Sequence, residues 1–342
     1  MKLLLIESVT AGACDRPLQR GLLEEAELML AAMVAETLAG AGPRRAGLAS
    51  RLLRRADLPS RAPDAEIRVP IGGWSVAWPG ALADVDAVWL VAPECGGELA
   101  ALSRQVEAHG ARLLGPSSAA VVVAGSKSAC HAALLGRVRQ PCDVTAGDGW
   151  VIKPDDGVAA EGVRRFRSAP EAASGRQDIV GGTLGPTMPD MPSGQIVQPF
   201  VAGEALSLCV LSDGQAARVL SVNRQHIAWG ADGRARYCGG VTNAIASRDR
   251  FLPMVRAVQA AIPGLWGCWG VDLVMPADGQ PVLIEVNPRL TTAFAHLRAA
   301  IGFDLLGAVL ALAAGQPLAS LPQVPAGHAV GFRLADAVEA AP

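Results

Sequence analysis

Alternating strand and helix patterns constrain the first third of the chain more strongly than any other feature. The apolar run 2–7 precedes residues 20–39, where apolar side chains recur at helical spacing. The buried-strand pattern 85–92 precedes a second helical segment, 99–109, and a short strand pattern follows at 112–114. Strands that alternate with helices favour a parallel sheet covered by helices. We therefore predict a small parallel α/β domain at the N-terminus.

The pattern changes after this region. Residues 168–194 are rich in Gly, Ser, Pro and Thr, which predicts a loop-rich, mobile segment. Strand patterns flank this segment and continue after it, and successive strands are close enough in the sequence to form hairpins. Two helical patterns also lie in this later part of the chain. The expected strands are 150–153, 195–201, 205–211, 217–222, 269–275 and 281–287, and the expected helices are 248–262 and 291–314, the latter broken near Gly302. We expect three domains, 1–115, 116–200 and 201–342.

Composition excludes several classes of protein. The formal net charge is −2 and there is no basic stripe, which argues against a nucleic-acid reader. No apolar stretch is long enough to span a bilayer, and Glu7 interrupts the first apolar run, which argues against a signal peptide. The seven cysteines form no CxxC pair, which favours reduced thiols in a cytoplasmic protein. The P-loop and the GxGxxG fingerprint are also missing.

The segment 270–292, GVDLVMPADGQPVLIEVNPRLTT, carries the most chemical information. Residues two apart on a strand share a face, so Glu285 and Asn287 point the same way. With a turn at its Pro-Ala-Asp-Gly, Asp272 would face Leu283 and lie diagonal to Glu285. Few oxygen ligands of this kind suit Mg²⁺ that is shared with substrate phosphates. The alternative is an amphipathic hairpin with a solvated acidic face. Arg289, just beyond, is suited to a phosphate or an acyl phosphate.

Lysine is scarce enough for each one to be considered singly. Of the 30 basic side chains only Lys2, Lys127 and Lys153 are lysine. Lys153 lies in a short apolar strand, and the small-residue loop 155–162 after it would let backbone N–H groups approach an anion. Lys127 opens a helical segment. The alternatives are an exposed edge-strand lysine and an ordinary first-turn residue.

Three features follow one another along the chain: Lys127, the strand lysine Lys153 with its loop, and the hairpin that ends in Glu-x-Asn-Pro-Arg. In this order they resemble the ATP-grasp superfamily over about residues 115–300. The resemblance implies an α/β (α+β) ATP-grasp fold: a small parallel α/β domain, a mobile lid domain, and a C-terminal antiparallel-sheet domain. It also implies that ATP binds with two magnesium ions, or with manganese in their place.

Residue roles follow from the same resemblance. Two lysines, the backbone of a hinge strand and a ribose-binding Glu would hold the nucleotide; these are Lys127, Lys153, Gln198, Phe200, Val201 and Glu204. The metal ligands would be Asp272, Glu285 and Asn287, and Arg289 would contact the transferred phosphoryl group. The loop 155–162 would be the lid over the triphosphate. Ala205 stands where some relatives carry the ribose-binding Glu, so Glu204 takes that role here.

Five segments resemble small ligases that join an amino acid to an amine, among them the tyramine–glutamate ligases of methanofuran-type cofactor biosynthesis: IESVTAG, LLEEAELML, LVAPECGGEL, VNRQHI and YCGGVTN, which holds the single tyrosine. The implied activity is ATP-dependent joining of a glutamate-like carboxylate to an amine through an acyl phosphate. The alternatives are a phosphotransferase that stops at the acyl phosphate, and an inactive nucleotide-binding regulator. The implied partners are small molecules, without nucleic acid or membrane, in a monomer or homodimer.

Substrate residues are the least constrained part of the sequence. Asn223 and Arg224 follow a strand and are candidates for binding the substrate carboxylate or the acyl phosphate, or they form a polar strand end. Glu7 and Glu94 end apolar strands of the first domain, where ligands of open α/β sheets bind. Either is a candidate for holding an ammonium group, with a helix cap or a solvent-facing position as the alternative.

Overall fold

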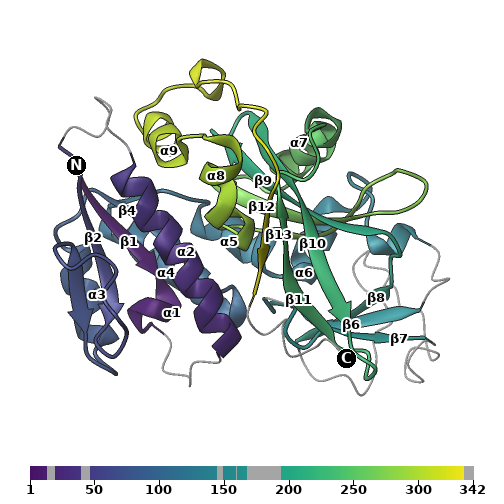
Figure 1. Cartoon of the computed structure of the whole chain (residues 1–342), viewed down its shortest axis with the longest axis horizontal. Helices are drawn as coiled ribbons and strands as arrows, with labels where there is room; N and C mark the ends of the chain where they lie inside the picture. Colours follow the sequence, from purple (N-terminus) through teal and green to yellow (C-terminus); the bar gives the residue numbers. More distant parts are fainter. Residues whose placement is uncertain (14–19, 40–46, 145–148, 159, 168–193, 335–342) are drawn as a thin grey trace.

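The structure, a computed structural model, describes residues 1–13, 20–39, 47–144, 149–158, 160–167 and 194–334. The first domain contains a five-stranded parallel sheet in the order β3-β2-β1-β4-β5 (Figure 1). Its strands are β1 (Lys2–Glu7), β2 (Ala49–Arg55), β3 (Glu66–Val69), β4 (Ala87–Val91) and β5 (Arg112–Leu113). Its helices are α1 (Ser8–Ala11), α2 (Arg20–Leu38), α3 (Trp74–Leu82) and α4 (Glu98–His109), with the 3₁₀ turn η1 (Cys95–Gly97) before α4. The predicted N-terminal α/β architecture is confirmed.

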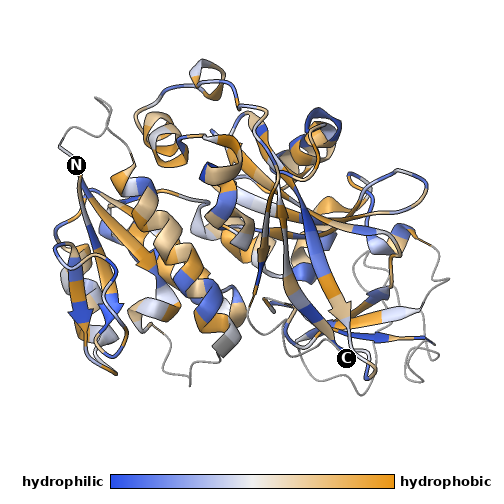
Figure 2. Cartoon of the chain, in the orientation of Figure 1, coloured by the Kyte–Doolittle hydropathy of each residue, from blue (hydrophilic) through white to orange (hydrophobic). Residues whose placement is uncertain are grey.

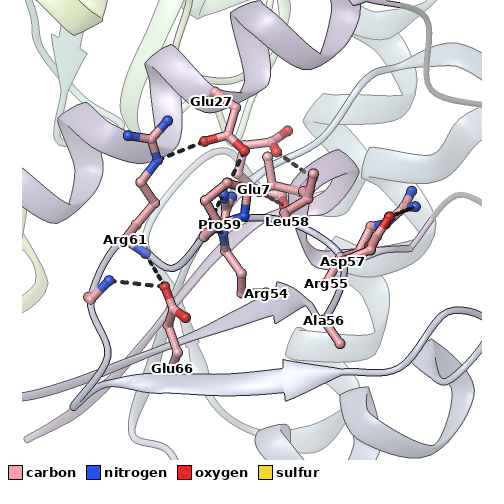
Figure 3. Close-up of polar contacts among 12 residues, drawn as sticks. Glu7, Glu27, Arg54, Arg55, Ala56, Asp57, Leu58, Pro59, Arg61 and Glu66 are labelled. Atoms are coloured by element: carbon pink, nitrogen blue, oxygen red, sulfur yellow. Dashed lines mark hydrogen bonds and ion pairs between the residues drawn. The ribbon is translucent and has the colours of Figure 1, made fainter.

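The central strands form because nearly every side chain of β1 and β4 is apolar and can be buried on both faces of a parallel sheet. Figure 2 shows β1 and much of α2 in the hydrophobic colours. Buried charged side chains interrupt this core, among them Arg54. Arg54 of β2 is fully buried, donates to the carbonyl oxygen of Pro59 at 2.6 Å and pairs with Glu27 of α2 at 2.7 Å (Figure 3). Glu27 also pairs with Arg61 at 2.9 Å, so this cluster ties α2 to β2 and to the turn after it.

A three-stranded antiparallel sheet, ordered β7-β6-β8, follows α5 (Ser118–Gly125), α6 (Lys127–Leu134) and the 3₁₀ turn η2 (Pro141–Asp143). Its strands are β6 (Trp150–Pro154), β7 (Arg164–Phe166) and β8 (Gln195–Pro199). The predicted loop-rich segment falls almost wholly outside the described residues.

A six-stranded antiparallel sheet, ordered β13-β12-β9-β10-β11-β14, makes up most of the rest. Its strands are β9 (Glu204–Ser212), β10 (Ala217–Trp229), β11 (Ala235–Thr242), β12 (Gly267–Met275), β13 (Val282–Asn287) and β14 (Val330–Arg333). The remaining helical segments are η4 (Asp249–Phe251), α7 (Leu252–Ala261), η5 (Thr292–His296), α8 (Leu297–Ile301), α9 (Leu305–Ala313) and η6 (Leu318–Ser320). One apolar cluster joins α5, α6 and α7 to one face of this sheet. A second joins η5, α8 and α9 to α2 and the first sheet.

The break that we expected near Gly302 is confirmed, since Gly302 adopts a left-handed φ of 62° and ends α8. One expectation needs correction. The strand expected at 217–222 extends to Trp229 and pairs with β11, which the sequence patterns did not indicate. Within the described residues, no single helix is both long and apolar enough to cross a membrane.

Candidate active site

The β12–β13 hairpin places its two carboxylates directly opposite each other. Asp272 pairs with Glu285, whereas Leu273 pairs with Leu283, so Ile284 is the extra residue of a β-bulge. The expected register, with Asp272 facing Leu283, is therefore wrong. The bulge shifts Glu285 from a diagonal to an opposed position, which brings the two side chains closer.

Amide side chains surround the inner carboxylate. The Nδ2 of Asn287 donates to Oδ2 of Asp272 at 3.1 Å, and the Nε2 of Gln225 donates to Oδ1 at 3.1 Å. Burial raises the pKa of Asp272 well above its usual range, and the charge of Glu285 raises it further. Two carboxylates this close repel each other unless a cation compensates them. No group of three His, Cys, Asp or Glu side chains gathers among the described residues to hold a metal. Carboxylate and amide oxygens such as those of the hairpin are donors that suit a magnesium ion sharing its other oxygens with a ligand.

Both lysines reach this carboxylate pair from separate elements. Lys127, the first residue of α6, lies 3.4 Å from Oε2 of Glu285 and donates to the carbonyl oxygen of Gly157 at 2.7 Å. Lys153 of β6 is 3% exposed, and its Nζ lies 3.4 Å from the carbonyl oxygen of the bulge residue Ile284. Burial alone would raise the pKa of Glu285, but the charges of the two lysines offset this and hold it at about 2. Two cations and an ionised carboxylate thus share one small volume.

These groups line a cavity of about 460 Å³. Its wall includes the expected nucleotide residues at the hinge between β8 and β9, which are Gln198, Phe200, Val201 and Glu204. Apolar side chains from β6, β12 and β13 complete this side: Val151, Leu273, Val274 and Ile284. A mostly apolar wall with a few polar groups is the usual composition of a small-molecule site.

Arg289 also lines the cavity, but its charge is already paired. Its Nε lies 3.0 and 3.1 Å from the two carboxylate oxygens of Glu94 in the first domain. Glu94 itself is not among the residues that line the cavity. Glu7 lies outside that wall as well, and its carboxylate caps α1 by accepting from the backbone N–H of Thr10 at 2.8 Å. Burial raises the pKa of Glu7 to about 7.

The remaining two candidates differ in position. Arg224 lines the cavity and pairs with Glu204. Asn223 is 1% exposed and lies in the sheet beneath the cavity, where its Oδ1 accepts from the backbone N–H of Asn243 at 3.0 Å. That bond holds Asn243 at a φ of 56°, in the left-handed region that few residues other than glycine adopt.

Sequence patterns missed further residues of the cavity wall, among them Glu25, Gln225, Tyr237 and Thr292. The RQ of VNRQHI and the single tyrosine belong to segments that carried the family resemblance, so a weak signal existed for Gln225 and Tyr237. Glu25 lies within LLEEAELML, another of these segments, but no pattern marked it as a site residue. Its side chain reaches the cavity because α2 packs against η5.

Comparison with known proteins agrees with this geometry. The profile of the ATP-grasp domain matches residues 124–293, and that of the pre ATP-grasp 3 domain matches residues 55–121. The tyramine–L-glutamate ligase of Methanocaldococcus fervens is 29% identical over 215 residues, which is 63% of this chain and 62% of that protein. The phosphoribosylamine–glycine ligase of Yersinia pestis is 28% identical over 208 residues, 53% of this chain and 48% of that protein. The chain thus spans 62% and 48% of the lengths of these relatives.

Solved structures share the fold. An ATP-grasp superfamily structure from Archaeoglobus fulgidus aligns with a TM-score of 0.66 at 24% identity, over 98% of this chain and 99% of that one. The L-amino acid ligase of Bacillus licheniformis aligns with a TM-score of 0.59 at 16% identity, over 94% of this chain and 77% of that one. With the lysines and the carboxylate hairpin in one cavity, and both profiles matched in order, the chain belongs to the ATP-grasp superfamily.

Proposed function

We propose that the chain is an ATP-dependent ligase that joins the carboxylate of a glutamate-like amino acid to an amine and releases ADP and phosphate. The observation that supports this proposal is the convergence of Lys127, Lys153, Asp272 and Glu285 on one cavity. The likeness to ligases that form C–N bonds gives further support.

Nucleotide binding would use groups that already line the cavity. The backbone of the hinge Gln198–Val201 would meet the adenine edge, and Glu204 would meet the ribose. The two lysines would act as point charges on the phosphate oxygens. Asp272, Glu285 and Asn287 would hold two magnesium ions, or manganese, which neutralise charge on those oxygens when bound.

The reaction would proceed in two steps. A carboxylate oxygen of the amino acid attacks the γ-phosphorus of ATP, and the bond from that phosphorus to the β-phosphate oxygen breaks. The products of this step are ADP and an acyl phosphate of the amino acid. The amine nitrogen then attacks the acyl carbon, the bond to the phosphate oxygen breaks, and the nitrogen gives up its proton. The lysines and Arg289 would stabilise charge on the phosphoryl oxygens, and Arg224 would orient the carboxylate. Asn223 would act indirectly, through its hydrogen bond with the backbone N–H of Asn243.

Water must be kept from the acyl phosphate, because hydrolysis would waste the intermediate. The loop after β6 is the proposed lid, and its two aspartates are docked. Asp155 accepts from the backbone N–H of Ser128 in α6 at 2.7 Å, and Asp156 accepts from the backbone N–H of Gly96 in the first domain at 2.8 Å. The loop thereby contacts both α6 and the first domain next to Lys127, and this position would suit a lid over the phosphates.

The decisive experiment is ADP release over a grid of amino acids and amines, with glutamate and tyramine as the first pair because a relative carries that name. ADP release that requires both an acid and an amine, with an amide product found by mass spectrometry, would support the ligase. ADP release that needs no amine would identify a phosphotransferase, and ATP binding without turnover would identify a regulator. We place such a ligase in cofactor biosynthesis in the cytoplasm.

A further inference from the structure

On the side of the cavity formed by α2 and η5 lies a carboxylate that forms no ion pair within the part of the chain that the structure describes. Glu25 of α2 lines the cavity, and its carboxylate accepts a hydrogen bond from the hydroxyl of Thr292 at 3.0 Å. Thr292 is neutral, and Glu25 takes part in no ion pair with any residue that the structure describes. Arg289, whose charge acts on Glu25, is already held by both carboxylate oxygens of Glu94. Two carboxylates therefore share one guanidinium.

Burial makes this imbalance unfavourable. Removal from water raises the pKa of Glu25, while the Thr292 hydroxyl and the charge of Arg289 act in the opposite direction. Glu25 also lines a second, small cavity of about 30 Å³, whose wall is mostly apolar but includes Glu7 and Arg289, with room for about one water molecule. Of these two cavities, the large one has the room to admit a ligand that carries a counter-charge to Glu25.

Glu25 is also placed beside the reacting groups. Burial acts to lower the pKa of Arg289, but the charges of Glu94, Glu25 and Glu285 together raise it. Tyr237 of β11 lines the same wall; burial raises the pKa of its phenol, and the charges of Asp272 and Glu25 raise it further. Glu25 therefore lies in the wall of the same cavity as Asp272 and Glu285.

We propose that Glu25 is the residue that binds the primary ammonium group of a substrate. The proposal rests on the proposed ligase function and adds a residue from the first domain to the site. The chemistry recognised is an R–NH₃⁺ group, which would belong either to the amino acid that is activated or to the amine that is joined to it. A charge-assisted hydrogen bond from ammonium to carboxylate would satisfy a carboxylate that has no ion-pair partner among the described residues.

The matched test is Glu25→Gln, because glutamine keeps an oxygen that can accept from Thr292 but removes the charge. Glu24→Gln, one residue earlier on the same helix and outside the cavity wall, is the control. Binding is measured by calorimetry in the presence of magnesium and ADP, so that turnover is not needed. The probes are glutamate, its deaminated analogue glutarate, tyramine and 4-ethylphenol.

We expect Glu25→Gln to weaken binding of one ammonium-bearing probe by about 10- to 100-fold and to leave its deaminated analogue and ATP unaffected. The probe that weakens, glutamate or tyramine, identifies which substrate supplies the ammonium. Equal affinities of wild type and Glu25→Gln for all probes would overturn the proposal. So would a parallel loss for glutarate and ATP, which would show a structural role.

A second measurement needs no variant and applies even if Glu25→Gln does not fold. The wild-type protein must prefer glutamate to glutarate, or tyramine to 4-ethylphenol; no preference in either pair would contradict the assignment. Failure of the ligase function is a separate result, because it would appear as absent ADP release in a wild-type protein whose ammonium preference is intact.

Discussion

Replacement of Lys153 by methionine should change nucleotide affinity and protein stability in opposite directions. Lys153 is 3% exposed, and burial lowers its pKa from the usual 10.5 to about 8, despite the attraction of Glu285. A pKa difference of this size corresponds to about 3 kcal/mol of folding free energy, because one unit is about 1.4 kcal/mol. Methionine has a similar length and no charge, so the ligand-free variant should be more stable by up to about 3 kcal/mol at pH 7.

The sign follows from proton binding. Between pH 8 and pH 10.5 the unfolded chain holds the Lys153 proton and the folded protein releases it, so this residue makes wild-type stability rise across that window. Below pH 8 the full penalty of the buried charge applies. The gain in the methionine variant should therefore be greatest at neutral pH and should disappear above about pH 10.5.

Nucleotide binding should respond in the opposite direction. One charge-assisted contact with phosphate is worth about 1.5–3 kcal/mol, so Lys153→Met should weaken ATP binding by roughly 10- to 150-fold. Lys127→Met is the matched comparison, since Lys127 donates to the carbonyl oxygen of Gly157 at 2.7 Å and lies 3.4 Å from Glu285. That variant should also bind ATP weakly, but it should be less stable than wild type.

The assays are urea denaturation at pH 7 and pH 10 and calorimetric titration with MgATP. Unchanged ATP affinity in Lys153→Met would refute the phosphate contact. A destabilised Lys153→Met at pH 7 would refute the burial argument, whatever its affinity.

Three further predictions concern the hairpin and the first domain. Glu285→Gln should lose magnesium-dependent ADP release by at least about 100-fold while it melts cooperatively, since a ligand is removed and the strand is kept; wild-type rates across a magnesium titration would contradict the metal assignment. Arg54→Met should lower the free energy of unfolding by about 3 kcal/mol or more in urea, because Glu27 loses its buried partner, with ATP affinity unchanged; a neutral effect would show that the ion pair does not stabilise the domain. Burial raises the pKa of Glu7 from 4.5 to about 7, so wild-type stability from this group is present below pH 4.5 and is lost as pH rises through 7. Glu7→Gln should therefore be more stable than wild type at pH 8 by up to about 3 kcal/mol and nearly equal at pH 4; an equal gain at both pH values would rule this explanation out.

Local sequence was sufficient wherever one short segment carried the whole signal. The run of apolar residues in Lys2–Glu7 predicted a buried strand, because such a run is stable only when both faces are covered. The order of Lys127, Lys153 and the acidic hairpin predicted the family, which both profiles support. The scarcity of lysine also helped this prediction. The chain uses arginine almost everywhere but has lysine at two positions where a compact charge suits packed phosphates.

Prediction failed where the outcome depended on pairing between distant segments. The bulge at Ile284 set the carboxylate register, and no residue type in the hairpin indicates such a bulge. β11 was missed because its sequence, ARYCGGVT, lacks the alternation of a half-buried strand, yet it pairs with β10 and carries Tyr237 into the cavity. Pairing supplied the hydrogen bonds that the pattern did not reveal.

The sequence alone determined which chemical groups the chain brings: two lysines, a hairpin with two carboxylates and an amide, and an arginine after it. Only the tertiary structure decided which of their charges lie close enough to compensate one another. In the folded chain Glu94 pairs with Arg289, whereas Glu7 caps α1. The sequence did not distinguish these two glutamates, because both end apolar strands. The tertiary structure also brought Glu25 from a helix to the cavity, where its carboxylate is hydrogen-bonded to Thr292 and has no ion pair with the residues that the structure describes. Charge balance depends on distances between segments far apart in the chain, and those distances are fixed by packing.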